Sequence, residues 1–159
     1  MRNRVVTTWL AAAALGASSV FAGALPDGGI SAQEVARVLQ DKGFRAEVTV
    51  DSVGDPLINS AADGTNFRVY FYGCAGDDEP RCTAIQFMAG FDLEDGMSLE
   101  RINLWNREHR FGRGYLDEEN DPFLEMDIDV ELGFTTESLA NNLDTWIYVL
   151  PKFKEFIGF

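Results

Sequence analysis

The stretch INLWNREHRFGRGYLDEENDPFLEMDIDVELG, residues 102–133, decides the fold class. It starts within a helix that carries apolar residues at helical spacing, passes through a basic turn and continues into a hairpin. Its last part alternates strictly between two kinds of residue: the apolar Leu124, Met126, Ile128, Val130 and Leu132, and the acidic Glu125, Asp127, Asp129 and Glu131. Such alternation is typical of a half-buried antiparallel strand. We therefore expect a strand at residues 123–132, paired with a strand at residues 111–117.

Three helices are predicted around this hairpin. Ser31 and Glu34 have the spacing of a capping box, and Gly43 suits the left-handed residue that ends a helix. Ser98 is expected to cap a second helix that leads into the deciding stretch. A third helix starts near residue 135 or 136, and Pro151 should bend or interrupt it.

The remaining segments complete an antiparallel sheet. Residues 46–51 are expected to form a strand and residues 56–64 a turn-rich connection. Residues 67–73 and 83–91 are apolar at nearly every position, which favours a hairpin in the centre of the sheet. Because hairpins occur in place of alternating strands and helices, the order predicts an α+β fold with helices packed against an antiparallel sheet.

The chain begins with the layout of a signal peptide. Arg2 and Arg4 precede an apolar run at residues 5–15, which small residues follow, and cleavage is expected after Ala22 or Ala24. A membrane anchor is the rival reading, but the apolar run is about half of the roughly 20 residues that span a bilayer. We predict a signal peptide at residues 1–24 and one periplasmic or secreted domain at residues 25–159, without a stable membrane anchor.

Two cysteines, Cys74 and Cys82, lie at the ends of the central hairpin loop. In an exported protein an even pair is most simply a structural disulfide. A redox-active pair and a metal site are the alternatives. Redox pairs favour C-x-x-C spacing, and two thiols without further His or Cys ligands make a poor zinc site.

The composition argues against several partners. The mature chain keeps 11 basic and 26 acidic residues, a formal net charge of −15. Such a surface repels phosphate backbones and anionic lipids, so neither nucleic acid nor a membrane surface is expected as a partner. The twelve phenylalanines argue against a disordered acidic tail.

Several motifs resemble the YbjN family of bacterial proteins. They are LERINLWNREHRFGRGYLD (residues 99–117) and DPFLEMDIDVELG (residues 121–133), together with Cys74, Cys82 and the closing segment around Trp146. The resemblance implies an α+β domain similar to type III secretion chaperones, a role in sensory transduction and no enzymatic activity. The leader departs from the cytoplasmic members, which puts a cytoplasmic regulatory role in doubt.

No catalytic, cofactor-binding or metal-ligating residues are predicted. Side chains on one face of a strand lie about 6.8 Å apart, so the acidic row does not converge as calcium requires. A solvated face is expected, with a weak divalent-cation site as the alternative. His109 is interpreted as a helix-end or core-edge residue, since no nucleophile matches it by motif. The cluster Arg107, Arg110 and Arg113 is expected to pair with the acids at residues 117–119.

The aromatic residues suggest a function. Core packing is their default role, but the last helix and its tail are also a possible protein interface, formed by Trp146, Phe153, Phe156 and Phe159. We therefore expect a non-enzymatic protein-binding, chaperone-like or adaptor-like domain, as a homodimer or in a complex. The alternatives are a periplasmic hydrolase that uses paired carboxylates and a structural or stress-related envelope protein.

Overall fold

Six strands form one antiparallel sheet in the computed structural model, which describes residues 28–159. Their spatial order is β1-β2-β3-β4-β6-β5. The strands are β1 (Glu47–Val50), β2 (Pro56–Ala62), β3 (Thr65–Ala75), β4 (Arg81–Gly90), β5 (Arg113–Leu116) and β6 (Pro122–Asp129). The helices are α1 (Ala32–Asp41), α2 (Leu99–Glu108) and α3 (Thr136–Ile157).

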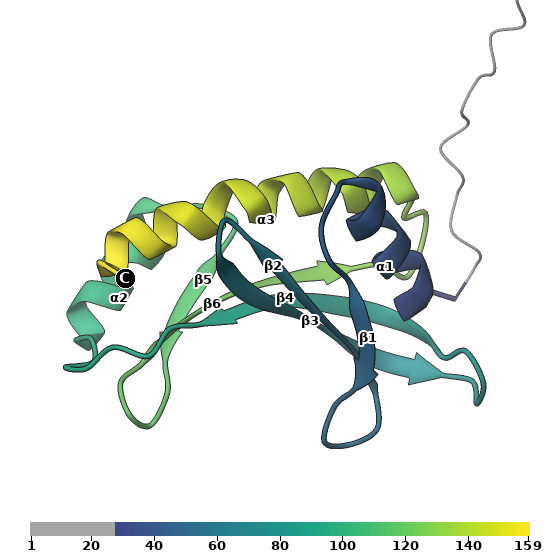
Figure 1. The fold of residues 1–159 in the computed structure, drawn as a ribbon, viewed down its shortest axis with the longest axis horizontal. Helices are drawn as coiled ribbons and strands as arrows, with labels where there is room; N and C mark the ends of the chain where they lie inside the picture. Colours follow the sequence, from purple (N-terminus) through teal and green to yellow (C-terminus); the bar gives the residue numbers. More distant parts are fainter. Residues whose placement is uncertain (1–27) are drawn as a thin grey trace, which may run out of the picture.

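The helices cover one face of the sheet and leave the other face open (Figure 1). The long α3 runs across the covered face, with α1 beside its beginning and α2 near its end. This arrangement confirms the predicted α+β class and its antiparallel sheet. The predicted signal peptide lies outside the described residues. None of the helices within residues 28–159 combines the length and the apolarity that a membrane crossing requires.

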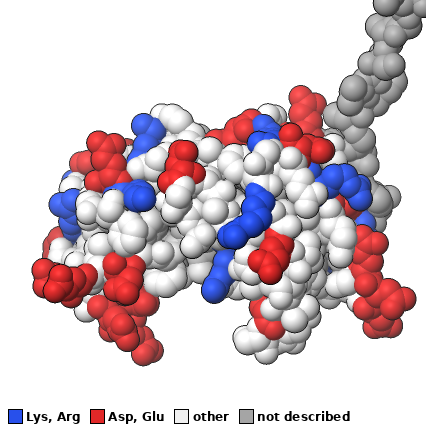
Figure 2. Space-filling view, in the orientation of Figure 1, with Lys and Arg blue, Asp and Glu red and all other residues white. Residues whose placement is uncertain are grey.

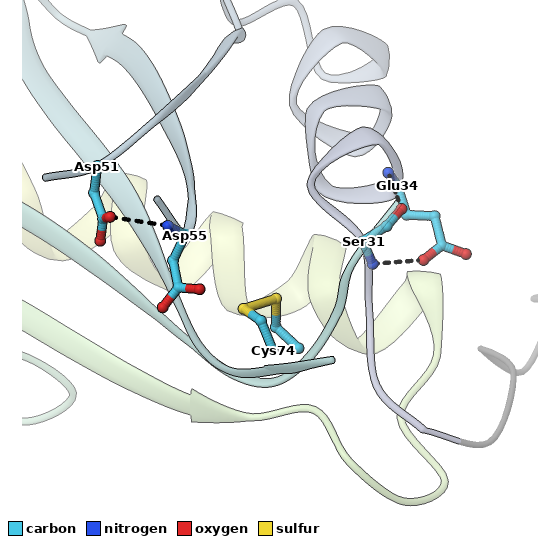
Figure 3. Close-up of a disulfide and its surroundings, with 6 residues drawn as sticks. Ser31, Glu34, Asp51, Asp55 and Cys74 are labelled. Atoms are coloured by element: carbon cyan, nitrogen blue, oxygen red, sulfur yellow. Dashed lines mark hydrogen bonds between the residues drawn. A yellow bond between two sulfur atoms is a disulfide. The ribbon is translucent and has the colours of Figure 1, made fainter. Parts of the chain in front are cut away.

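The start of α1 is the predicted capping box. The backbone N–H of Glu34 donates to the Ser31 hydroxyl, and the Ser31 N–H donates to the Glu34 carboxylate at 2.9 Å (Figure 3). These two bonds satisfy donors that a helix start otherwise leaves free. Gly43 follows the helix in the left-handed region, with φ of 86°, as its sequence position predicted.

The prediction of a turn-rich connection at residues 56–64 is wrong, because β2 occupies most of this segment. β2 pairs with β1 on one side and with β3 on the other. Ile58 and Ser60 are buried, and the Ser60 hydroxyl donates to the Arg45 carbonyl at 2.6 Å. The small polar residues of this segment have little strand propensity of their own. Pairing with two neighbours and burial of one face make it a strand.

The central hairpin is confirmed, since β3 and β4 lie inside the sheet order. Cys74 and Cys82 face one another across these two strands and form a disulfide (Figure 3). Ile30 exchanges two backbone hydrogen bonds of 2.9 Å with Cys82 on the other side of β4. The first described residues are therefore tied to the sheet beside the disulfide.

β6 is shorter than predicted. Its inward row of Leu124, Met126, Ile128 and the following Val130 is buried, as the alternation indicated. The strand ends at Asp129, where the Asp129 carboxylate accepts the N–H of Glu131 in a local turn. Leu132, which was expected in the same apolar row, lies beyond this turn and is 79% exposed.

The sequence predicted that Pro151 bends or interrupts the last helix, and α3 continues through this residue without interruption. A proline in a helix interior costs about 3 kcal/mol. Leu150, Phe153 and Ile157 are buried next to it, and each buried apolar side chain contributes about 1.5–3 kcal/mol. Packing of the last two turns against the sheet and α2 therefore outweighs the penalty.

An aromatic cluster joins α3 to the sheet. Trp146 stacks on Phe87 of β4 with ring centroids 5.7 Å apart, and it meets Phe67 of β3 edge-on at 5.8 Å. Such pairs contribute about 0.5–1.5 kcal/mol beyond the burial of their area. The cluster fixes the position of α3 over the two central strands.

Replacing both cysteines, Cys74→Ala with Cys82→Ala, should lower the free energy of unfolding by about 2–3 kcal/mol, because the unfolded chain regains loop freedom. Urea denaturation of the oxidised protein and of the double variant measures this difference. A loss below about 0.5 kcal/mol would show that the cross-link contributes little to this fold.

Candidate functional site

Two of the four predicted interface residues belong to the core. Trp146 and Phe153 have no exposed surface, so they are not available to a partner of the folded protein. Phe156 is half-buried, and Phe159 is 56% exposed with its ring 5.2 Å from that of Phe91. The apolar stripe of a helix points toward its own domain, which explains the burial of the first two.

A surface groove lies beside Phe156, between the end of α2 and the last turns of α3. We call it the aromatic groove. It has a volume of about 550 Å³. Its lining residues are Trp105, Glu108, His109, Arg110, Phe111, Tyr148, Val149, Lys152, Glu155 and Phe156. This lining combines aromatic rings with two acidic side chains, Glu108 and Glu155, and two basic side chains, Arg110 and Lys152.

The floor of the groove is a stack of rings. His109 caps the C-terminal end of α2 and lies flat on Trp105, with ring centroids 3.9 Å apart and an interplanar angle of 11°. Phe156 meets Trp105 at 5.4 Å and His109 at 5.8 Å. The Trp105 indole N–H donates to the Gly112 carbonyl at 3.1 Å, which fixes its orientation. The interpretation of His109 as a core-edge residue agrees with this position.

One wall of the groove is Phe111, which has an unusual backbone. Its φ is 76°, in the left-handed region, and its side chain is 65% exposed. A bulky residue in this region is a genuine outlier that costs on the order of 1–2 kcal/mol. The fold thus presents an aromatic ring to solvent at a position where glycine would be more stable.

The opposite wall comes from the polar side of α3. Tyr148, Lys152 and Glu155 follow one another at helical spacing, away from the buried stripe. Tyr148 is 62% exposed, and the Lys152 ammonium lies 4.6 Å from the centre of its ring. Within residues 28–159, neither Lys152 nor Arg110 has a carboxylate oxygen within 4.0 Å.

The arginine cluster pairs differently from the prediction. Arg107 approaches Glu108 at 3.5 Å, and Arg113 pairs with Glu125 across β5 and β6. The acids of residues 117–119 were the wrong partners, because Asp117 instead accepts the N–H groups of Glu119 and Asp121, both at 2.9 Å. That carboxylate shapes the β5–β6 turn.

The acidic row of β6 lies on the open face of the sheet. Glu125 is only 4% exposed, so the prediction of a fully solvated face is wrong at this position, where Arg113 covers the carboxylate. Asp127 accepts a bond of 2.8 Å from Gln86, which also meets the Tyr72 hydroxyl. Burial and the nearby Asp127 carboxylate raise the pKa of Tyr72 above its ordinary value of 10.

Two further observations bear on catalysis. Among the described residues, no group of three or more His, Cys, Asp and Glu side chains could hold a metal ion. A second concavity, of about 580 Å³, contains Glu47, Asp92 and Asp121. In this concavity the Asp121 carboxylate accepts the Leu93 N–H at 2.9 Å, which stabilises the loop that contains Leu93.

The fold is that of an α+β domain with a one-sided antiparallel sheet and an aromatic groove between two of its helices. The model of the YbjN family, described as "Putative bacterial sensory transduction regulator", matches residues 31–159. The chain therefore belongs to the YbjN family. The family description concerns regulation and names no enzymatic activity.

No curated protein matches the chain. A solved structure with a similar chain is the type III secretion chaperone SycH of Yersinia pestis in complex with a stable fragment of YscM2. The two chains are 12% identical with a TM-score of 0.44, and the match covers 73% of this chain and 92% of that chain. No functional argument is drawn from a similarity of this degree.

The residues that form the groove walls were missed from the sequence. Tyr148 is an aromatic residue on the otherwise polar and charged side of the last helix, and a helical-wheel projection of the sequence makes this visible. The positive φ of Phe111 could not be predicted from the sequence, which shows only that this residue lies between a helix and Gly112. The value of φ depends on how the chain enters β5.

The variant Phe111→Gly should raise the free energy of unfolding by up to about 1 kcal/mol, because glycine adopts the left-handed region without strain. Chemical denaturation measures the change. The control Tyr148→Ala alters an exposed ring on regular helix and should stay within about 0.5 kcal/mol of the parent. A loss of stability in Phe111→Gly would mean that the ring supports the fold.

Proposed function

We propose that this chain is an exported regulatory protein that binds a partner protein through the aromatic groove. The observation that carries this proposal is the pair of exposed rings, Phe111 and Tyr148, at 65% and 62% exposure on opposite walls. Aromatic residues and arginine are enriched where proteins meet, and a few such anchors supply most of the binding energy. Strain at Phe111 supports a role for its ring outside the fold.

The occupant of the groove is a segment of a different protein that presents an apolar side chain to the groove and polar or charged residues on either side of it. His109 and Phe156, which pack on the fully buried Trp105, offer an apolar floor. Arg110 and Lys152 at the border can receive carboxylates, because no described acid neutralises them within 4.0 Å.

A second copy of this chain is a poorer occupant. Each mature chain carries a formal net charge of −15, and Figure 2 shows acidic side chains projecting from the lower loops of the molecule. Among these loops are the β5–β6 turn and the β3–β4 turn, with the sequences DEEND (residues 117–121) and DDE (residues 77–79). Two such surfaces repel each other over about 8–10 Å at physiological salt.

Export rests on two independent features. The first 24 residues have the order of a signal peptide, and Cys74 is joined to Cys82. Disulfides persist in the periplasm and outside the cell and are rare in the cytosol. The proposal therefore places the mature domain, residues 25–159, in the periplasm or outside the cell.

Site-specific crosslinking in the native envelope tests the partner. A photoreactive residue at position 148 should yield a crosslink to one heterologous protein. The same residue at position 132, which is as exposed but remote from the groove, should not. The variant Phe111→Gly, which keeps the fold, should reduce the crosslink from position 148 at least tenfold, as the loss of a hot-spot residue does.

Two outcomes would contradict the groove as the binding site. One is a crosslink of equal yield from positions 132 and 148. The other is a crosslink from position 148 that Phe111→Gly leaves unchanged. A crosslink between two copies of this chain would also contradict the heterologous partner.

An intact-mass measurement of the protein from the envelope fraction tests export. We expect the mass of a chain that begins after Ala22 or Ala24 and lacks two hydrogens because Cys74 and Cys82 are joined. A mass that includes residues 1–22 would contradict cleavage. A chain that carries one blocking group on each of the two cysteines after isolation under thiol-blocking conditions would contradict the oxidising compartment.

A further inference from the structure

The strand β1 ends the sheet on one side, and its outward backbone groups are open. Asp51 donates its N–H to the Asp55 carbonyl at 2.8 Å, and Thr49 lies opposite Leu57 two residues earlier. Hydrogen bonding alternates along an antiparallel pair, so residues 47, 49 and 51 bond toward β2. The N–H and C=O groups of Val48 and Val50 therefore point away from the sheet. Within residues 28–159, no hydrogen bond from another segment reaches them.

The opposite edge of the sheet is closed. The Asn106 side chain of α2 donates to the Gly114 carbonyl of β5 at 2.9 Å and accepts the Gly114 N–H at 2.8 Å. These two bonds take the place that an added strand would use at this residue. Natural proteins protect strand edges in such ways because an open edge pairs with other chains.

β1 has no comparable cover, and its side chains suit strand pairing. All four of its residues are exposed. Val48 is 41% exposed, Val50 63% and Val53, in the adjoining turn, 81%. β-branched residues favour extended backbone, so the strand is prepared to accept a neighbour. The Asp51 carboxylate stabilises the adjoining turn by accepting the N–H groups of residues 53, 54 and 55.

Charge selects the occupant of this edge. Residues 45–55 contain one basic residue, Arg45, and three acidic residues, Glu47, Asp51 and Asp55. A second copy would bring the same excess of acidic residues to this edge, and like charges directly opposite one another destabilise a sheet. An extended segment with Lys or Arg opposite Glu47 and Asp51 would instead form attractive cross-strand pairs.

We propose that β1 accepts an extended basic segment of a partner protein as an additional strand of the sheet. The segment alternates β-branched residues with Lys or Arg. Main-chain hydrogen bonds to Val48 and Val50 supply its affinity, and the carboxylates around β1 supply its selectivity. This site lies at the opposite end of the sheet order from β5 and does not depend on the aromatic groove.

Amide hydrogen exchange of the mature domain, followed by NMR, tests the proposal. The probe is a capped nine-residue peptide that alternates Lys and Val. At about ten times its Kd, this peptide should slow the exchange of the Val48 and Val50 amides about tenfold, because only the free fraction exchanges. An analogue with Glu in place of Lys should leave both amides unchanged.

Three variants separate hydrogen bonding along the β1 edge from other effects of the peptide on the protein. Val50→Pro removes an outward N–H but none of the bonds to β2, so it should abolish protection of Val48 by the peptide. The matched variant Val50→Thr keeps both the N–H and the β-branched shape, so the peptide should still protect the Val48 amide. The variant Phe111→Gly should also keep this protection, because the aromatic groove is a separate site.

Three results would overturn the proposal. The first is that the exchange rates of the Val48 and Val50 amides stay unchanged at the highest concentration at which the peptide is soluble. The second is equal protection by the acidic analogue. The third is protection that grows with protein concentration in the absence of peptide, which would assign the edge to a second copy of this chain.

Discussion

The packing of α3 across the two central strands is the contact on which the rest of the structure depends. Trp146 lies against Phe67 and Phe87, and it holds one helix over the middle of the sheet. Because α3 has 22 residues, it reaches past the sheet to α2, where Phe153 meets Trp105 with ring centroids 4.9 Å apart. The same helix that builds the core therefore also builds one wall of the groove.

This arrangement uses the helices on one face and leaves distinct surfaces elsewhere. The open face of the sheet is internally satisfied, since Arg113 covers Glu125 and Gln86 joins Asp127 to Tyr72. Phe111 and Tyr148 in the groove and Val48 and Val50 along β1 expose apolar surface toward the two ends of the sheet. A family described as regulatory suits the proposed binding of other proteins at these two separate surfaces.

The sequence predicted those elements whose signals are local. The capping box at Ser31 and Glu34 and the alternation from Leu124 to Val130 depend on residues close in the chain, and both are present. β2 was missed because its strand state comes from two neighbours and not from its own residues. The sequence also left open whether Pro151 bends or interrupts α3, because the burial of Phe153 and Ile157 that keeps the helix continuous is a tertiary effect.

The site was predicted less well than the fold, for a related reason. Aromatic residues at helical spacing can face either the core or a partner, and only packing separates Trp146 and Phe153 from Tyr148. The most direct test is hydroxyl-radical footprinting of the protein, purified and in its native envelope. We predict that Phe111 and Tyr148 are labelled in the purified protein and protected in the envelope, while Trp146 stays unlabelled in both. Equal labelling of Phe111 and Tyr148 in the two samples, or labelling of Trp146 in the purified protein, would contradict this account.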